Sequence, residues 1–483
     1  MAQKTKEQNA ILKTLAMLSE GQFNHDTGIV REGSKLVLPN TWSVKKGITT
    51  LIAYNEAMEA ETTFSRTFKY RPWDGAAAFE RAVVYLTGTH GIGQETRSFF
   101  GVSPPARHTI QVGVNETLNV PWDRISIPLF DTNDVQCVAS LGSDNVPDVG
   151  LLFALTVRAA KQFESQINAF FDIIQTELDE RSIYRGKAIN GAEMPDFLDL
   201  TSVDPEMVIY SDEVTEQMDA HVWGVLKYAD AMRANGISLK RSVLFHGPYG
   251  TGKTLGGMLT AQVATANGWT FIMCRPGKDD PFSVLQTAQL YAPAVVFIED
   301  IDTYSRSSGM GLDQMSQLLD KFDGIEAKGH EILNVMTTNH EESITKGMLR
   351  PGRLDALIEI SHLDRNGVER MVKSKLPPEM MDNIDFDLVY ETCLGYLPAF
   401  VAEAVNRAKN ASIVRGKGEL LPLTTADIRN GAMSLRPQFN LMEKATEVEI
   451  PPVLDGVFKG IMREAVIGLD VTAEDFVATI EEG

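Results

Sequence analysis

The fold of this chain is decided by the stretch Gly247-Pro248-Tyr249-Gly250-Thr251-Gly252-Lys253-Thr254, which fits the P-loop pattern G-x-x-x-x-G-K-[ST]. The residues just before it, 242–246, are apolar and β-prone and end at a Gly-Pro break, which predicts a buried strand. Residues 255–266 predict a helix. Strand, glycine-rich loop and helix in this order are the context that the motif requires.

Each part of the motif has a chemical task. Glycines let consecutive backbone N–H groups turn inward toward phosphate oxygens, and the start of the helix adds partial positive charge. The Lys253 ammonium can reach the terminal phosphates, and the Thr254 hydroxyl can bind Mg²⁺. With ATP and Mg²⁺ as the expected cofactors, the predicted binding residues are Gly247, Pro248, Tyr249, Gly250, Thr251, Gly252, Lys253, Thr254 and Leu255.

The composition is that of an ordinary globular protein. The 483 residues are 43% hydrophobic and 23% charged, with a formal net charge of -20, which argues against a broad nucleic-acid surface. No apolar run is long enough to span a bilayer, and the first residues lack the apolar core of a signal peptide. The three widely spaced cysteines are interpreted as reduced thiols, so we expect a cytoplasmic protein without a membrane partner.

Residues 1–150 are interpreted as an α+β domain that recognises a substrate or partner. Short period-2 runs predict strands, for example residues 64–70 and 108–114. Asp74 is the predicted N-cap of a helix that runs through residue 86. His90 and His108 stand alone and are interpreted as structural, so this region shows no catalytic constellation.

Residues 151–197 are expected to form a helical linker. Apolar side chains recur at helical spacing from Phe163 to Leu178. Either a long helix joins the N-terminal domain to the next one, or the helix belongs to the core of one of the two domains.

Two further strand ends carry polar side chains that suit ATP chemistry. Residues 294–298 form an apolar run that ends in Glu299 and Asp300, the position of the Walker B acids, which order the Mg²⁺ shell and polarise the attacking water. Residues 334–338 form a second apolar run, followed by Asn339. The segment 349–355 then supplies two more cations, Arg350 and Arg353.

These motifs, in this order, resemble the AAA family in its narrow sense, within the AAA+ superfamily. The resemblance covers residues 198–434, about half of the chain. It implies a doubly wound parallel α/β sheet in residues 198–361 and a small helical lid in residues 362–437. It also implies that Asn339 positions the water and that Arg350 and Arg353 reach the γ-phosphate of a neighbouring subunit. A guanidinium supplied from a neighbour requires an oligomer, and a homo-hexameric ring is expected.

The lid segment 395–404 also resembles this family. Ala399 stands where DNA-acting branches of the superfamily carry a second-sensor arginine. This substitution disfavours a replication initiator or a clamp loader, and with them a nucleic-acid partner.

The chain departs from the family pattern in two places. The Walker B acids are inverted: Glu299 falls at the Mg²⁺ position, with Thr254, and Asp300 at the water-polarising position. This order, with residues 336–340, resembles the mitochondrial translocase branch that acts on the Rieske iron–sulfur protein. The segment 274–282 lacks the aromatic–hydrophobic–Gly loop with which unfoldases grip a polypeptide, and Phe282 is interpreted as core.

Residues 438–483 are expected to be an acidic helical extension. No Lys or Arg follows Arg463, whereas six acids do. The segment is either a solvated end of the chain or a helix that docks on a subunit or partner.

Three functions are compatible with these motifs. The first is a Mg²⁺-ATP-dependent ring-forming ATPase that remodels or translocates proteins or protein complexes. The second is a nucleotide-gated assembly or scaffold factor that scarcely hydrolyses ATP, suggested by the inverted acids. The third is a nucleic-acid motor, which the acidity of the chain disfavours.

Overall fold

The computed structural model divides the chain into two compact units, residues 1–361 and residues 362–483. It describes residues 60–446 except for 89–95, 99–100, 104–105, 133–134, 193, 302, 304–329, 341–349 and 351–352, together with a few short stretches before residue 60. The lone His90 and most of the C-terminal extension lie outside the described residues. Among those that are described, no helix is long and apolar enough to cross a bilayer.

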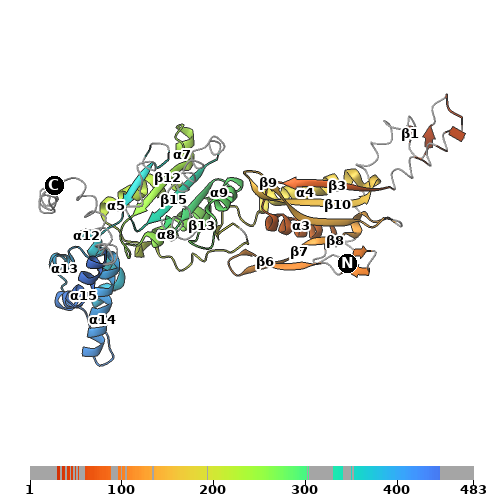
Figure 1. Cartoon of the computed structure of the whole chain (residues 1–483). Helices are drawn as coiled ribbons and strands as arrows, with labels where there is room; N and C mark the ends of the chain where they lie inside the picture. Colours follow the sequence, from red (N-terminus) through yellow and green to blue (C-terminus); the bar gives the residue numbers. More distant parts are fainter. Residues whose placement is uncertain are drawn as a thin grey trace, which may run out of the picture. The chain divides into compact units, whose positions relative to one another are not determined.

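The first unit begins with a four-stranded antiparallel sheet of order β3-β10-β9-β8, packed against the helices α3 and α4 (Figure 1). The sheet forms because alternate residues of the long strand β10 are apolar and face the helices. Phe153, Leu155 and Val157 are fully buried there. The strands are β3 (Glu61–Phe68), β8 (Asp123–Ser126), β9 (Val138–Val146) and β10 (Gly150–Ala160), and the helices are α3 (Pro72–Thr87) and α4 (Glu164–Arg181).

The prediction of a helical linker was wrong for its first part. Residues 151–160 are strand β10, which is paired on both sides within the N-terminal sheet. The helical spacing of Phe163 to Leu178 does not extend back into this segment, where alternate residues are buried as in a strand. The helix α4 follows and packs on the same sheet, so it belongs to the core of this part of the chain.

Several small elements surround this sheet. The hairpin of β6 and β7 is the longest, and its paired strands carry a bulge between Gln111 and Gly113. The remaining pieces are β1 (Val30–Glu32), β2 (Lys35–Val37), β4 (Thr96–Ser98), β5 (Gly101–Ser103), β6 (Arg107–Gly113), β7 (Glu116–Pro121) and the short 3-10 helices η2 (Pro128–Phe130) and η3 (Lys161–Phe163).

A six-stranded parallel sheet of order β11-β13-β14-β15-β12-β16 forms the second half of this unit. The strand order reverses beside β12, and ligands of such sheets bind at the carboxyl ends of the strands at this switch point. The strands are β11 (Ala188–Asn190), β12 (Arg241–His246), β13 (Thr270–Cys274), β14 (Ala294–Ile298), β15 (Ile332–Thr338) and β16 (Ala356–Glu359).

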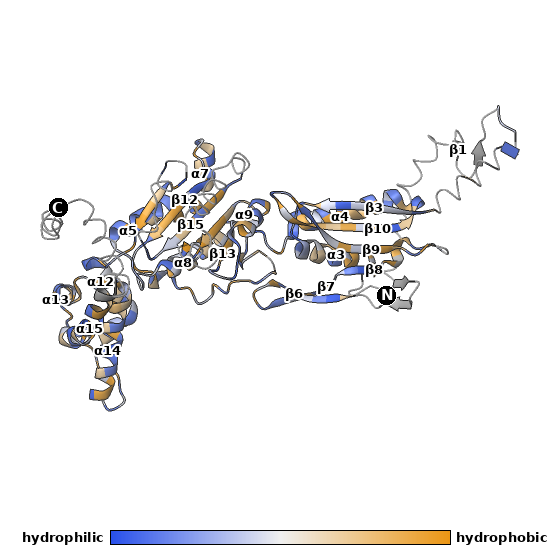
Figure 2. Ribbon diagram, in the orientation of Figure 1, coloured by the Kyte–Doolittle hydropathy of each residue, from blue (hydrophilic) through white to orange (hydrophobic). Residues whose placement is uncertain are grey.

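Helices cover both faces of the parallel sheet, which explains why its strands are apolar throughout (Figure 2). Alternate residues of β14 pack in different clusters: Val295 and Phe297 join the cluster of α5 and α8, and Val296 and Ile298 join that of α9. The surrounding helices are η4 (Pro205–Met207), α5 (Asp212–Met218), the π-helix η5 (Asp219–Trp223), α6 (Gly224–Lys227), α7 (Ala229–Ala234), α8 (Lys253–Ala266) and α9 (Pro281–Leu290).

The second unit is helical in its described part. An aromatic cluster of Tyr396, Phe400 and Phe439 packs its helices together, with ring centroids 4.9–5.8 Å apart. Its elements are α12 (Arg365–Lys375), the 3-10 helix η8 (Pro378–Met380), α13 (Phe386–Cys393), α14 (Pro398–Arg415) and α15 (Thr425–Thr446).

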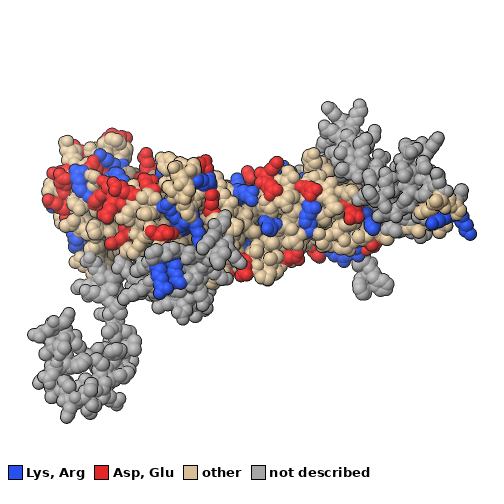
Figure 3. Space-filling model, turned by 90° about the horizontal axis from the view of Figure 1, so that it is seen from above, with Lys and Arg blue, Asp and Glu red and all other residues tan. Residues whose placement is uncertain are grey.

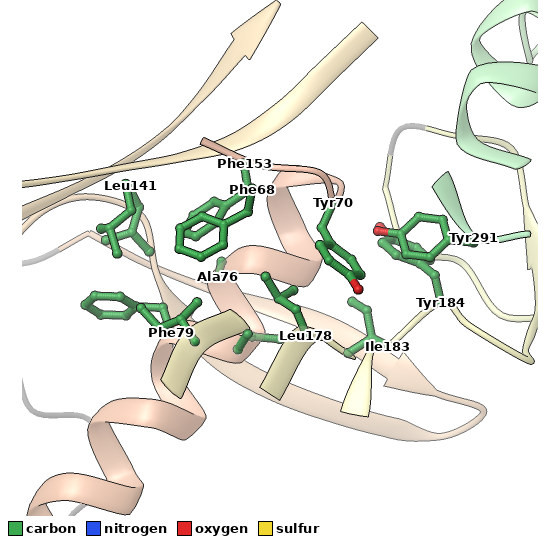
Figure 4. Close-up of a cluster of buried hydrophobic side chains, with 14 of the residues drawn as sticks. Phe68, Tyr70, Ala76, Phe79, Leu141, Phe153, Leu178, Ile183, Tyr184 and Tyr291 are labelled. Carbon is green, nitrogen blue, oxygen red and sulfur yellow. The ribbon is translucent and has the colours of Figure 1, made fainter. Parts of the chain in front are cut away.

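The antiparallel and parallel sheets of the first unit share one hydrophobic cluster, in which Tyr70, Tyr184 and Tyr291 lie side by side (Figure 4). Asp74 is the polar centre of this junction and is 1% exposed. Its carboxylate accepts hydrogen bonds from the Ser182 hydroxyl (2.7 Å), the backbone N–H of residue 183 (2.9 Å) and the Tyr291 hydroxyl (3.0 Å).

Asp74 is therefore not the N-cap of α3, as the sequence had indicated. The helix begins at Pro72, with Arg71 as its N-cap, and Asp74 lies in the first turn. Its carboxylate serves tertiary partners instead. Burial raises the pKa of Asp74 to about 6, against the lowering effect of these hydrogen bonds.

The junction should therefore make stability depend on pH. Because the folded-state pKa, about 6, lies above the ordinary value of 3.8, the carboxyl lowers the stability of the fold progressively as pH rises from 3.8 to about 6. The unfolding free energy of Asp74→Asn minus that of the unmodified chain should therefore rise by about 3 kcal/mol between pH 4 and pH 7. Denaturant unfolding at a series of pH values measures this. The exposed Asp172→Asn is the control, and an equal shift in both variants would contradict the assignment.

Candidate active site

The P-loop joins β12 to α8 in the predicted position. Gly250 and Gly252 have φ angles of 85° and 95°, in the left-handed region that glycine adopts without strain. A Cβ on Gly247 would lie 2.0 Å from the carbonyl oxygen of Ile360, so the backbone of this loop passes too close to its neighbour for any other residue. The glycines of the motif are therefore required by the turn itself.

Lys253 is the first residue of α8 and is only 7% exposed. Its ammonium donates hydrogen bonds to the carbonyl oxygens of Gly247 (2.7 Å) and Pro248 (2.9 Å). A buried ammonium in the middle of a phosphate-binding turn favours an anion beside it, because burial removes the water that would otherwise solvate the charge.

Two hydrogen bonds bring the polar strand ends together beside the P-loop. The Thr254 hydroxyl donates to a carboxylate oxygen of Glu299 (2.6 Å), so the two predicted Mg²⁺ ligands are adjacent. The Asn339 side-chain amide donates to a carboxylate oxygen of Asp300 (2.8 Å), so the two predicted water-positioning residues are also adjacent. A hydroxyl and a carboxylate oxygen are hard donors that fit Mg²⁺, which usually binds few protein ligands together with phosphates.

The backbone at Asp300 is unusual. Its φ angle is 43°, in the left-handed region, which costs a non-glycine residue free energy. The N–H of Asp300 donates to the Thr337 hydroxyl (2.9 Å), which holds this conformation. The conformation redirects the Asp300 side chain at the end of β14 and places its carboxylate against Asn339. Thr337 is the second-last residue of β15, and nothing local in the sequence distinguishes its hydroxyl as the acceptor for Asp300.

Tyr210 supports the loop from the side. Its hydroxyl donates to the carbonyl oxygen of Gly252 (2.8 Å), and a Cβ on Gly256 would lie 2.3 Å from the Tyr210 hydroxyl oxygen. Burial raises the pKa of Tyr210 above its ordinary value, so the group stays a neutral donor. Around the loop, Tyr249 and Leu255 are exposed, and the Tyr249 ring lies edge-on to the ring of His340, with centroids 6.4 Å apart.

The two predicted arginine fingers lie together before β16, the strand beside β12. The backbone N–H of Arg353 donates to the carbonyl oxygen of Arg350 (3.1 Å). Arg350 is exposed and Arg353 is half-buried. Their action on a neighbouring subunit stays a prediction.

The charged loop between β13 and α9, residues 275–280, is held by ion pairs and hydrogen bonds. The Arg275 guanidinium pairs with Asp279 (2.9 Å) and Asp196 (3.0 Å). The Asp280 side chain caps α9, and Phe282 is partly buried against the shared cluster, as the core interpretation expected. Asp279 and Asp280 of this loop therefore have structural partners within the chain.

The region around the site matches known proteins. Residues 243–362 match the model of the "ATPase family associated with various cellular activities (AAA)". A proteasome-activating nucleotidase 1 of Halobacterium salinarum is 30% identical over 231 residues, which cover 44% of this chain and 54% of the relative. Over 46% of this chain, an ATP-dependent zinc metalloprotease FtsH 1 of Conexibacter woesei is 28% identical, and 36% of the relative is covered.

A cell division cycle protein 48 homolog of Archaeoglobus fulgidus is 29% identical over 54% of this chain and 36% of its own length. The chain thus matches about half or less of the length of these relatives. The parallel sheet, the P-loop and the two polar strand ends lie within or beside the matched residues. The chain therefore carries an ATPase domain of the AAA family.

Proposed function

We propose that this chain is a Mg²⁺-ATP-dependent ATPase that assembles into a ring and remodels or translocates proteins or protein complexes. The observation that carries the proposal is the pairing of Thr254 with Glu299 and of Asn339 with Asp300 beside a glycine-determined P-loop. Relatives that are named for work on proteins, such as the proteasome-activating nucleotidase, support a protein substrate.

In this mechanism the residues of the chain bind and orient the reactants. The P-loop N–H groups and Lys253 hold the phosphates, and Thr254 and Glu299 would hold Mg²⁺, which neutralises phosphate charge. Asp300 accepts a proton from the attacking water, which Asn339 keeps in line. Arg350 and Arg353 of one subunit stabilise the charge that develops on the γ-phosphate in the next, which makes a hexameric ring the expected assembly.

The surface and the thiols support this choice of partner and compartment. On the face that Figure 3 shows, acidic and basic side chains are interspersed, which suits proteins as partners better than nucleic acid. The cysteines Cys137, Cys274 and Cys393 are buried free thiols, which fits a reducing compartment such as the cytoplasm.

A scaffold that binds ATP with little hydrolysis is the alternative. It is favoured by the short side chain of Asp300, which is one methylene shorter than the glutamate usual at this position. ATP turnover per subunit, measured against protein concentration together with the particle mass, separates the two. Turnover that rises as a ring forms supports the motor, and a ring with ATP but no turnover supports the scaffold.

Removal of the P-loop ammonium should prevent nucleotide binding. Lys253→Ala is expected to weaken ATP binding by about a hundredfold or more, because charge-assisted hydrogen bonds to phosphate are lost. Isothermal titration with ATP and Mg²⁺ measures this. Lys278→Ala, at an exposed lysine, is the matched control, and equal affinities in both variants would remove Lys253 from the site.

Arg353→Ala should bind ATP normally and lose turnover by about a thousandfold, since the guanidinium acts only on transition-state charge. A mixture of Arg353→Ala and Lys253→Ala chains tests the sharing of sites. An interface in which the Arg353→Ala subunit supplies the P-loop and the Lys253→Ala subunit supplies the arginine has an intact site, so part of the turnover should return. A mixture as inactive as its components would show that the arginine does not act across subunits.

Asp300→Asn should lower turnover by about a hundredfold to ten-thousandfold and leave ATP affinity unchanged, because a proton acceptor is lost and no ATP ligand is removed. Single-turnover hydrolysis measures the chemical step. Glu331→Gln, which breaks an ion pair with Arg233 away from the loop, is the control. Full turnover in Asp300→Asn would reassign the base.

A further inference from the structure

A cavity of about 540 Å³ lies at the junction of the two sheets of the first unit. Its walls come from the start of α3, the ends of β9 and β10, the helix α9 and the residues after β11. Pockets of about 300–1,000 Å³ are large enough for a ligand of several residues or a drug-sized molecule. None of the proposed ATPase residues lines this cavity.

Large apolar side chains line the cavity, and two of them are about half exposed to solvent. Leu151 is 49% exposed and Met194 is 53% exposed. The rings of Trp73 and Trp122 pack together on the same wall, with centroids 4.7 Å apart. Exposed apolar and aromatic side chains that converge on one hollow are typical of a recognition site.

A buried cation, Arg71, forms one wall and is 5% exposed. Among the described residues its partners are neutral: the Thr287 hydroxyl, the carbonyl oxygen of Leu151 and that of Ser283. These bonds use four of the five N–H groups of a guanidinium. The remaining N–H is on Nη1. This atom lies beside Gly150, only 2.9 Å from the position that a Cβ on that residue would take, and Gly150 also lines the cavity. A desolvated guanidinium favours an anion.

The cavity is also bounded by an open strand edge. The N–H of Phe153 donates to the carbonyl oxygen of Tyr70, on the side of β3. Phe153 lies opposite Ser143, so the peptide groups of Ser143 and Asn145 point away from β10. β8 pairs with residues 138–141 only, and no strand in the described part of the chain pairs with 143–146 on that side. Ser143 and Asn145 both line the cavity.

We propose that this cavity binds an extended polypeptide segment of a partner protein, which adds a strand beside Ser143 and Asn145. One large apolar or aromatic side chain of the segment fills the space between Trp73, Trp122, Leu151 and Met194. A carboxylate of the segment pairs with Arg71. Added strands gain affinity from backbone hydrogen bonds and specificity from side-chain pockets, and this site supplies both.

The inference deepens the proposed function, because it names the surface that would recognise a protein substrate, and it is tested without ATP. The probes are fluorescein-labelled hexapeptides: Gly-Ser-Val-Phe-Val-Asp and an array in which each position is varied in turn. Fluorescence anisotropy with the nucleotide-free chain should show saturable binding that weakens at least tenfold when Phe becomes Ser, Asp becomes Asn or alternate backbone amides are N-methylated. Lys253→Ala should bind these peptides normally, which separates recognition from ATP turnover.

Variants of the chain locate the binding. Leu151→Glu and Met194→Glu should each weaken binding at least tenfold, and Tyr85→Glu, at an exposed residue that does not line the cavity, should not. Arg71→Met should remove the preference for Asp over Asn in the probe, provided that its thermal unfolding is unchanged.

Three outcomes would overturn the proposal. The first is that no peptide of the array binds in a manner that depends on Leu151. The second is equal binding of the N-methylated probe. The third concerns Glu193, which is outside the described residues but follows Ala192 and precedes Met194 in the sequence. If acidic probes bind only after Glu193→Gln, the chain itself supplies the anion.

Discussion

The structure depends on a buried polar contact between α3 and the end of α9. Asp74 is hydrogen-bonded to Tyr291 and to the segment that follows α4, Arg71 is hydrogen-bonded to Thr287, and both charged side chains are buried. Leaving either charged group buried without its hydrogen bonds would cost about 1–3 kcal/mol or more. Together with the shared aromatic cluster, these contacts join the antiparallel sheet and the parallel ATPase sheet in one compact unit.

The helix α9 connects the two sheets of the first unit. The helix α9 leads directly into β14, whose end carries Glu299 and Asp300. The same helix packs in the hydrophobic cluster that it shares with the N-terminal sheet. The proposed peptide cavity borders α9 and the N-terminal sheet, so a bound segment would contact the helix that precedes β14.

The inverted acids are accommodated by the backbone. The left-handed turn at Asp300, held by Thr337, changes the direction of the side chain and brings it to Asn339. The Thr254 hydroxyl donates a hydrogen bond to the longer side chain of Glu299. The two acids thus have different polar neighbours, Thr254 for Glu299 and Asn339 for Asp300.

The sequence by itself determined the elements whose signals are local. The P-loop, the apolar strands that end in Glu299 and Asn339, and the α/β class follow from spacing and residue type, because a phosphate cradle demands glycines and a lysine in one short stretch. Tertiary structure decided the strand β10, the role of Asp74 and the shared junction. The carboxylate of Asp74 is bound by Tyr291 and β10 is paired with β3, and both partners are distant along the chain. Neither an apolar run nor a lone carboxylate indicates in the sequence which partner will bury it.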